Sequence, residues 1–426
     1  LVVYPTEELM GVISAPPSKS YTHRATIIAS LAEGESIIHS PLVSGDVIST
    51  TKACEAFGAN IKHRKRSWFI KGTGGKLKTP ENIIDVENSG TTLRFMTAIA
   101  ALAPGATVLT GDQSIRRRPM GPLLKALKQL GVEAFSTRND NPPVVVKGGG
   151  LKGGKVSIRG DISSQFISGL LIASPYAAHD VAIEIVGQLK SIPYIEMTLE
   201  TLSKARAKLS FSENLRQFFI PGNQVLFPFD FRIPGDFSSA SYLLAAAAVT
   251  KSNLKVRNIS FESKQGDKEI VNILRKMGAR IRIFKNAISV EGGYPLTGIE
   301  IDASNIPDLV PTLAVLGAIA KGKTVIKNVP HARYKETDRL KAPAVELKKM
   351  GAKIRELPDG LVIKGVKQLK GARLHGYYDH RMVMALAVAG LIAKGKTVID
   401  TAEAAKISYP EFVETIRKLG ANLKLD

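Results

Sequence analysis

Apolar and polar positions along the chain repeat with two periods, one helical and one strand-like. Apolar runs of helix length, such as "TIIASLA" (26–32), alternate with short β-type runs, such as "TVIKNV" (324–329). A second, amphipathic helix then ends in a glycine turn that leads into another strand. The turns read "FGANI", "LGVEA", "MGARI", "MGAKI" and "LGANL". Because glycine commonly caps helix C-termini, this pattern predicts α/β units with the order βαβαββ.

The pattern occurs six times, and each copy is recognised by the start of its apolar helix. These starts lie about 70 residues apart, at Ser18, Ser89, Ser163, Ser238, Pro307 and Asp379. Six units divide naturally into two domains of three, and a chain of 426 residues is too long for one ordinary core. The segment "FPFDFRIPGD" (227–236) interrupts the pattern, so we expect domains at 14–232 and 233–426. The strand before Pro16 belongs to no complete unit and could pair with either domain.

Composition narrows the class of protein. The hydrophobic fraction is 44%, and no uncharged apolar run of 18 residues occurs, so we expect no transmembrane helix. The first ten residues contain acids and no basic residue, so we expect no secretory leader. The single cysteine, Cys54, excludes a disulfide framework and a multi-cysteine metal site, and fits a reducing cytoplasm. The net charge of +21 favours anionic partners. A nucleic-acid-binding protein is one alternative, but aromatic residues are only 6% of the chain and do not interleave with the basic runs.

Two segments match the sequence motif of a phosphate-binding loop, which would suggest an ATPase. "GAIAKGKT" (317–324) and "GLIAKGKT" (390–397) fit the spacing, but that motif needs a strand before it and a helix after it. Here an apolar helix precedes each match and a strand follows. We therefore predict that Gly322 and Gly395 end helices.

The starts of the apolar helices carry unusual chemistry. Lys19 lies in the first turn of its helix, and Arg24 follows one turn later, although a cation at a helix N-terminus costs about 0.3–1 kcal/mol. Serine at such a position is ordinarily a cap, "KETDR" (335–339) could be a plain helix start, and a lone cation is ordinarily surface charge. However, equivalent ends of six repeats all supply cations, hydroxyls or acids. If the two triplets face each other, these ends line one interdomain cleft that binds at least two anionic groups.

The motifs together resemble the 5-enolpyruvylshikimate-3-phosphate synthase family along the whole chain. They are "PPSKSYTHRA", "NSGTTLRF", "RRRPMG", "GDISSQFISGLL", "SIPYIEMT", "GDFSSASYLLAAAA", "IPDLVPTLAV", "RYKETDRL" and "DHRMVMALAV". The resemblance implies a two-domain inside-out α/β barrel of six βαβαββ units with an interdomain active-site cleft, and residues 1–13 packing into the C-terminal domain. Because the ligand groups would then come from both halves of the chain, we expect the domains to close when shikimate 3-phosphate binds. The resemblance also implies transfer of the enolpyruvyl group of phosphoenolpyruvate to the 5-hydroxyl of shikimate 3-phosphate, on the route to chorismate and aromatic amino acids.

The resemblance assigns roles to individual residues. The residues implied to bind shikimate 3-phosphate are Lys19, Ser20, Arg24, Ser163, Ser164, Gln165, Ser191, Tyr194, Asp308, His331 and Lys335. Those implied to bind phosphoenolpyruvate are Lys19, Asn88, Gly90, Arg118, Gln165, Glu336, Arg339, His380, Arg381 and Lys406. Asp308 is the implied base at the 5-hydroxyl, Glu336 handles the proton at the methylene carbon, and Lys19 is the third catalytic group. Fixed cations can neutralise both substrates, so we expect no metal and no cofactor.

Three positions depart from the family pattern: His331 for a frequent Asn, Phe95 for a frequent Pro, and Ser89 for a frequent Ala. The related enolpyruvyl transferase that acts on UDP-N-acetylglucosamine is the nearest rival. It carries a Lys-Asn pair where this chain has Lys19-Ser20, and a reactive Cys in the loop before Arg118, where this chain has none. We expect a cytoplasmic monomer that binds neither nucleic acid nor membrane.

Overall fold

The computed structural model describes residues 1–425, and the chain divides into two compact units. The N-terminal unit comprises Pro17–Ile233, and the C-terminal unit comprises Leu1–Pro16 and the chain from Pro234 onward. The chain therefore passes between the units twice, beside the prolines at 16–17 and at 234. The sequence pattern places these boundaries at residues 14 and 233.

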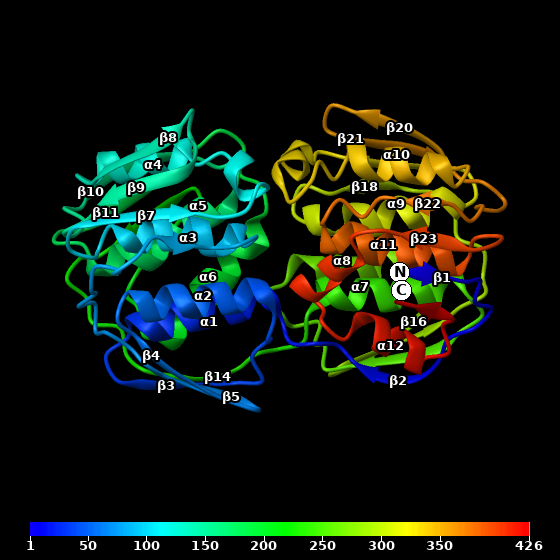
Figure 1. Ribbon diagram of the computed structural model, residues 1–426, viewed down its shortest axis with the longest axis horizontal. Helices are drawn as coiled ribbons and strands as arrows, with labels where there is room; N and C mark the ends of the chain where they lie inside the picture. Colours follow the sequence, from blue (N-terminus) through cyan, green and yellow to red (C-terminus); the bar gives the residue numbers. More distant parts are fainter. Residues whose placement is uncertain (426) are drawn as a thin grey trace. The chain divides into compact units, whose positions relative to one another are not determined.

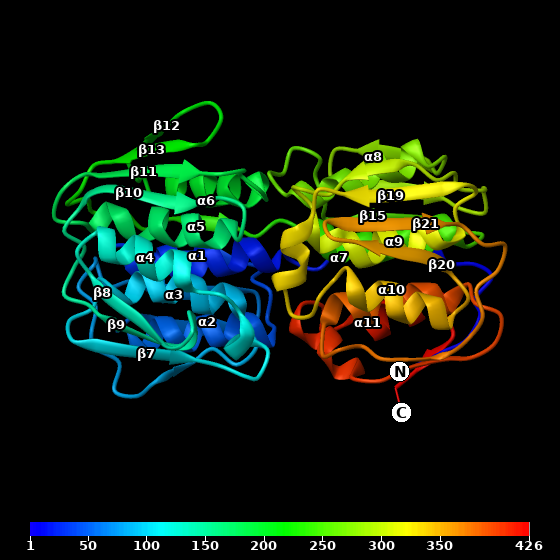
Figure 2. The same cartoon turned by 90° about the horizontal axis from the view of Figure 1, so that it is seen from above.

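The N-terminal unit contains three four-stranded sheets and six α-helices (Figures 1 and 2). Its helices are α1 (Lys19–Leu31), α2 (Gly45–Ala56), α3 (Gly90–Ala100), α4 (Gly121–Gln129), α5 (Ser164–Ala173) and α6 (Ile192–Lys204), with short 3₁₀ turns η1 (Ile115–Arg117) and η2 (Ser174–Tyr176). Its strands are β3 (Glu35–His39), β4 (Asn60–Arg64), β5 (Ser67–Lys71), β6 (Ile84–Asp85), β7 (Ala106–Thr110), β8 (Glu133–Arg138), β9 (Asn141–Lys147), β10 (Gly154–Arg159), β11 (Val181–Val186), β12 (Ser210–Phe211), β13 (Gln217–Ile220) and β14 (Asp230–Arg232).

The C-terminal unit repeats the same architecture. Its helices are α7 (Phe237–Val249), α8 (Glu269–Lys276), α9 (Val310–Ile319), α10 (Lys341–Lys349), α11 (His380–Leu391) and α12 (Phe412–Lys418), with 3₁₀ turns η3 (Gly266–Lys268), η4 (Pro307–Leu309), η5 (Pro330–Tyr334) and η6 (Ala402–Ile407). Its strands are β1 (Val2–Val3), β2 (Met10–Ser14), β15 (Asn253–Arg257), β16 (Arg280–Phe284), β17 (Ala287–Glu291), β18 (Glu300–Asp302), β19 (Lys323–Lys327), β20 (Lys353–Leu357), β21 (Gly360–Lys364), β22 (Arg373–Leu374), β23 (Thr397–Ile399) and β24 (Leu423–Lys424).

The sheets follow the predicted βαβαββ repeats, and three of the six are built from one continuous repeat each. In the second repeat the strands lie in the order β6-β7-β9-β8, with β6 parallel to β7 and the other neighbours antiparallel. The parallel pair is joined by the apolar helix α3, as a parallel connection requires. The same order recurs in the third and fifth repeats, β10-β11-β13-β12 and β18-β19-β21-β20.

The leading strands of two repeats come from distant parts of the chain. β2 pairs in parallel with β15, so that Met10 lies opposite Asn253 and Ser14 opposite Arg257. In the N-terminal unit, β14 is the last strand in sequence. It pairs in parallel with β3 and takes the place of the leading strand of the first repeat. β1 lies between β23 and β24. The strand before Pro16 therefore pairs within the C-terminal unit.

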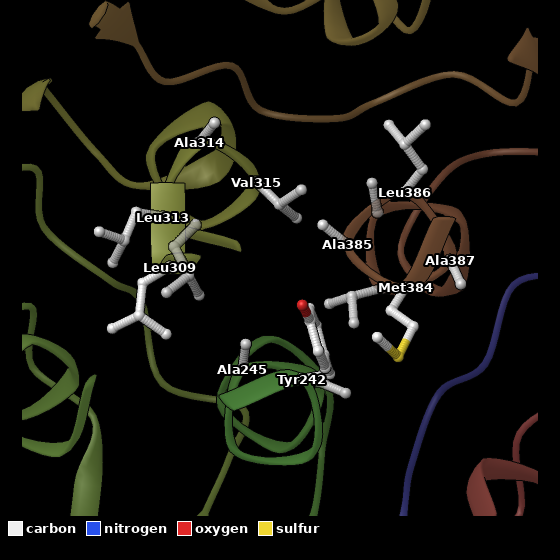
Figure 3. Packing of buried hydrophobic residues seen from close by; sticks show 14 of the residues in the cluster. Tyr242, Ala245, Leu309, Leu313, Ala314, Val315, Met384, Ala385, Leu386 and Ala387 are labelled. Atoms are coloured by element: carbon white, nitrogen blue, oxygen red, sulfur yellow. The ribbon is translucent and has the colours of Figure 1, made fainter. Parts of the chain in front are cut away.

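The apolar helices lie at the centre of each unit and the sheets lie outside them, which is the inside-out arrangement. All twelve residues of α11 are buried, as are nearly all residues of α1 and α7. A helix that is apolar on every side needs such an interior position. In the C-terminal unit, α7, α9 and α11 meet through side chains that include Tyr242, Leu313 and Met384 (Figure 3).

The glycine turns occur where the sequence pattern predicts them. The glycines of the five turns after the second helices, at 58, 131, 278, 351 and 420, have φ between +83° and +106°, a region that favours glycine. Gly322 and Gly395 have φ of +96° and +88°, and each lies between a helix and a strand. The order helix–turn–strand confirms that neither motif match is a phosphate-binding loop. No helix within residues 1–425 is long and apolar enough to span a bilayer.

Candidate active site

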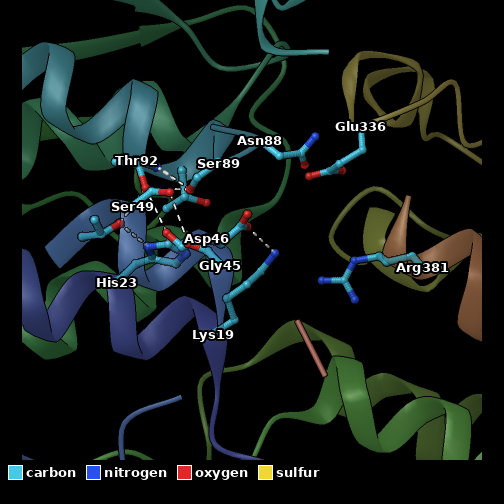
Figure 4. Close-up of polar contacts among 12 residues, drawn as sticks. Lys19, His23, Gly45, Asp46, Ser49, Asn88, Ser89, Thr92, Glu336 and Arg381 are labelled. Atoms are coloured by element: carbon cyan, nitrogen blue, oxygen red, sulfur yellow. Dashed lines mark hydrogen bonds and ion pairs between the residues drawn. The ribbon is translucent and has the colours of Figure 1, made fainter. Parts of the chain in front are cut away.

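The cation at the start of α1 is balanced by an acid on α2. Ser18 caps the helix, because its side chain accepts a hydrogen bond from the Tyr21 amide. Lys19 is the first helical residue, and its Nζ donates to Oδ2 of Asp46 at 2.9 Å (Figure 4). Both side chains are almost completely buried, so this ion pair is shielded from water. Asp46 was not among the predicted site residues; its only signal in the sequence is an acid in the first turn of a helix.

Arg24 is buried one turn further along α1. It donates to the Ser20 carbonyl, the Tyr194 carbonyl and the Thr198 hydroxyl at 2.8–2.9 Å. No carboxylate is among its partners in the described chain. Burial is the main cause that lowers its pKa, to about 10. Phe95, one of the departures from the family pattern, lies under the guanidinium at 5.2 Å, so this aromatic ring contributes a cation–π contact.

The start of α3 is held close to two arginines. Ser89 is the N-cap and accepts from the Thr92 amide, a bond that the family's frequent alanine cannot make. A Cβ atom on Gly90 would lie 2.1 Å from Nη1 of Arg118. Glycine at this position leaves room for the guanidinium, which would have to move if residue 90 carried a Cβ atom. Backbone amides at a helix start and a guanidinium together favour an anion.

The side chains around this helix start form a connected set. Nδ2 of Asn88 donates to Oδ2 of Asp112 at 2.7 Å and to Oγ of Ser114 at 3.1 Å. Nη2 of Arg118 also donates to Ser114, at 3.4 Å. These bonds join the predicted residues Asn88 and Arg118 through the loop before α4.

Gln165 links α5 to α3. Its Oε1 accepts from Nη1 of Arg94 at 2.6 Å, and its Nε2 donates to Oγ1 of Thr91 at 2.8 Å. Arg94 is buried, and Phe166 lies beside its guanidinium at 5.5 Å. Both sides of the Gln165 amide are thereby fixed. The structure adds Arg94 and Thr91 to the predicted set.

The hydroxyls predicted to bind phosphate lie at the starts of α5 and α6. Ser163 caps α5 and accepts from the Gln165 amide at 3.3 Å, and Ser164 follows as the first helical residue. Ser191 precedes α6 with φ of +57°, an uncommon conformation for serine. Lys190, beside it, is 5% exposed and was also missed by the sequence motifs.

In the C-terminal unit, Asp308 is the centre of a cluster of cations. It lies in η4, immediately before α9. Its carboxylate accepts from Arg339 at 2.8 Å and Arg381 at 2.7 Å, and Nζ of Lys335 is 3.4 Å away. Burial alone would raise the pKa of this carboxyl. The three cations, Arg381 first, outweigh burial and hold the pKa well below its usual range.

Arg339 is the most heavily paired cation of this cluster. It also donates to Glu336 at 2.5 Å, and to both oxygens of Asp379 at 2.9 and 3.0 Å. A guanidinium has five N–H groups, and protein carboxylates occupy four of them. Its pKa is raised by these carboxylates against the opposing effect of burial. The "KETDR" segment is therefore not a helix start, because α10 begins only at Lys341.

Three further predicted residues differ in how far they are buried. His331 is buried in η5, and His380 is the buried first residue of α11. Lys406 lies in η6 with an exposed side chain. Within residues 1–425, no group of three or more His, Cys, Asp or Glu side chains is placed to hold a metal ion.

Comparison with known proteins identifies the family. The profile of EPSP synthase (3-phosphoshikimate 1-carboxyvinyltransferase) matches residues 3–416. The 3-phosphoshikimate 1-carboxyvinyltransferase of Methanocaldococcus jannaschii is 53% identical over 429 residues, covering 100% of this chain and 99% of the relative. That of Methanococcoides burtonii is 55% identical over 417 residues, covering 97% of each chain. The solved EPSP synthase of Acinetobacter baumannii superposes with a TM-score of 0.82 at 26% identity, covering 99% of this chain and 98% of that one.

The fold and the profile together define an enolpyruvyl transferase of two inside-out α/β units. The chain belongs to the EPSP synthase family, as its sequence motifs predict.

Proposed function

We propose that the helix starts described above bind the two anionic substrates of a 3-phosphoshikimate 1-carboxyvinyltransferase. The reaction transfers the enolpyruvyl group of phosphoenolpyruvate to the 5-hydroxyl of shikimate 3-phosphate and releases phosphate, a step of aromatic amino-acid biosynthesis. The observation that carries the proposal is the contact of Arg118 with the start of α3, where Gly90 leaves the guanidinium room. A phosphate or carboxylate there meets a fixed cation and backbone amides.

The remaining assignments follow the chemistry of each residue. In this proposal the residues that bind shikimate 3-phosphate are Lys19, Ser20, Arg24, Ser163, Ser164, Gln165, Ser191, Tyr194, Asp308, His331 and Lys335. Those that bind phosphoenolpyruvate are Lys19, Asn88, Gly90, Arg118, Gln165, Glu336, Arg339, His380, Arg381 and Lys406. Arg24, buried without a carboxylate partner, is suited to the carboxylate of the shikimate ring.

Proton transfer requires an acid and a base that exchange roles between addition and elimination. We assign the proton of the 5-hydroxyl to Asp308 and the proton of the methylene carbon to Glu336. In the described chain Asp308 is held ionised by cations that an anionic substrate would also attract. Substrate binding to Lys335 and Arg381 therefore weakens their hold on Asp308 and makes it a stronger base. Lys19 supplies a point charge and a proton for the departing phosphate.

We further propose that the enzyme is a cytoplasmic monomer that binds neither nucleic acid nor membranes. The composition supports the compartment, since the sequence carries one cysteine, Cys54, which is buried. Burial raises the pKa of its thiol to about 12, so it is inert as a nucleophile.

Two glycines that begin helices provide the test. Gly90→Ala places a methyl group against Arg118 and should raise the KM for phosphoenolpyruvate several-fold, because the guanidinium must move. Gly45→Ala is the matched control: Gly45 begins α2, and a Cβ there meets no atom within 4 Å. Equal KM values for the two variants and the parent would exclude an anion site at the start of α3.

A further inference from the structure

A chain of buried polar side chains connects α1, α2 and α3 within the N-terminal unit. Nδ1 of His23 lies 2.7 Å from Oγ1 of Thr50, and Oγ1 of Thr50 lies 2.6 Å from Oγ1 of Thr92. Thr92 in turn donates to Oγ of Ser89 at 2.6 Å (Figure 4). Each of these four residues is 0% exposed. Buried polar groups joined by hydrogen bonds strongly restrict how the elements carrying them can pack.

The number of available protons determines which group donates in each of these hydrogen bonds. A threonine hydroxyl has one proton to donate. The proton of Thr92 is used on Ser89, with the Asp46 carbonyl as a weaker second acceptor at 3.3 Å. Thr50 must therefore donate to Thr92, and it must accept from His23. This pattern assigns the proton of His23 to Nδ1 and leaves Nε2 as a bare lone pair.

The surroundings of His23 agree with a neutral ring. Its Nε2 has no hydrogen-bond partner in the described chain, and a buried lone pair is tolerated better than a buried unpaired cation. Burial, followed by the nearby charges of Lys19 and Arg24, lowers its pKa well below the ordinary value. His23 therefore acts as a permanent hydrogen-bond donor to Thr50.

The series of hydrogen bonds that begins at His23 ends at Thr92, which contacts two parts of the proposed site. Ser89 caps α3 and directly precedes Gly90, where we place phosphoenolpyruvate. The carbonyl of Asp46 accepts from Thr92, and the Asp46 carboxylate holds the Lys19 ammonium. The same threonine hydroxyl thus touches both the cap of α3 and the residue that anchors Lys19.

We propose that His23 is a positioning residue for the phosphoenolpyruvate site. Through Thr50 and Thr92 it fixes the start of α3 and the backbone of Asp46, and thereby the places of Gly90 and Lys19. His23 touches neither substrate. This inference rests on the proposed function, because it takes the start of α3 as the place where phosphoenolpyruvate binds.

The first test compares two substitutions of nearly equal size. His23→Leu removes the donor, whereas His23→Asn keeps an N–H at the place of Nδ1. We expect His23→Leu to lower kcat/KM for phosphoenolpyruvate about tenfold, since small displacements of binding groups are costly, and to raise the KM for shikimate 3-phosphate by a smaller factor, because Lys19 also binds that substrate. His23→Asn should recover most of the loss. Equal kinetics of the Leu and Asn variants, both folded by circular dichroism, would overturn the proposal.

The second test covers the case in which His23→Leu does not fold. Thr50→Val removes the hydroxyl that links His23 to Thr92, with little change of side-chain volume, whereas Thr50→Ser preserves this hydroxyl. A raised KM for phosphoenolpyruvate in Thr50→Val alone supports the positioning role. A change in melting temperature with unchanged KM values would show that the chain is purely structural.

A third measurement reads the hydrogen-bond chain directly. Imidazole ¹⁵N chemical shifts of the parent enzyme should show the Nδ1–H form of His23, neutral at pH 6. The Nε2–H form would contradict the donor assignment. If the parent releases no phosphate from the two substrates, the proposed function itself fails. An active parent with kinetically silent His23 and Thr50 variants removes this inference alone.

Discussion

The ammonium of Lys19 lies 2.9 Å from Oδ2 of Asp46, and the two residues lie in the first turns of neighbouring helices of the same unit. This ion pair explains how a lysine is accommodated where a helix disfavours cations. It also holds the ammonium at one place, as the role proposed for Lys19 at the departing phosphate requires.

Lys19→Met should lower kcat by at least about a hundredfold, because in the proposed function Lys19 is a general acid and a phosphate-binding charge. The folded state should persist, as monitored by circular dichroism. Lys341→Met is a suitable control, since Lys341 is also the first residue of a helix but is exposed. A Lys19→Met enzyme that turns over at a rate near that of the parent would remove the catalytic role of this lysine.

Local features of the site could be predicted from the sequence, and long-range pairings could not. Ser18 as a cap and Gly322 as a helix terminator depend on neighbours within a few residues. The repeat pattern likewise predicts the α/β class and six repeat units, which correspond to the six sheets of the structure. In contrast, Asp46 lies 27 residues from Lys19 and outside every recognised motif. Nothing in its own surroundings marks it as the partner.

The acidic cluster around Arg339 likewise could not be predicted from the sequence. Its three carboxylates, from Asp308, Glu336 and Asp379, come from three separate segments. Sequence motifs assign Arg339 to phosphoenolpyruvate, but they do not reveal that four of its five N–H groups are already engaged. The resemblance places residues 1–13 in the C-terminal domain, but the sequence does not reveal the strand pairs that β2 forms with β15 and β14 forms with β3.

Asp308→Asn should reduce stability in a way that depends on pH. The carboxyl pKa is depressed in the folded enzyme, whereas an unfolded aspartate titrates near pH 3.9. The ionised carboxylate therefore stabilises the fold above about pH 4, and this contribution is lost as the pH falls towards the folded pKa. The difference in unfolding free energy between parent and variant should be largest above pH 5, at about 3 kcal/mol, and shrink towards pH 3.

Asp161→Asn serves as the control for this measurement. Asp161 is half-buried and pairs with the exposed Arg159, and such surface pairs contribute only about 0–1 kcal/mol. A difference for Asp308→Asn that stays constant from pH 7 to pH 3 would mean that its charge does not stabilise the fold.

Asp267→Asn should show the opposite dependence on pH. Asp267 is buried, accepts a hydrogen bond from the Ser238 hydroxyl, and faces the charges of Asp308, Arg381 and Asp236. Burial, with Asp308 next, raises its pKa to about 7. The fold therefore favours the protonated acid, and the parent loses stability as the pH rises from about 4 to about 7.

Asparagine resembles the protonated acid and keeps the acceptor for Ser238. The variant should melt a few degrees above the parent at pH 8, where the buried charge costs most, and the gain should largely vanish at pH 4.5. Thermal unfolding at the two pH values decides the matter. A variant that is less stable than the parent at pH 8 would show that the Asp267 charge supports the fold.

The reaction itself is tested most directly by phosphate release from the purified enzyme. The account predicts release only when shikimate 3-phosphate and phosphoenolpyruvate are both present, with one phosphate formed for each enolpyruvyl group transferred. Release with UDP-N-acetylglucosamine in place of shikimate 3-phosphate, release from ATP alone, or no release with both substrates would contradict it.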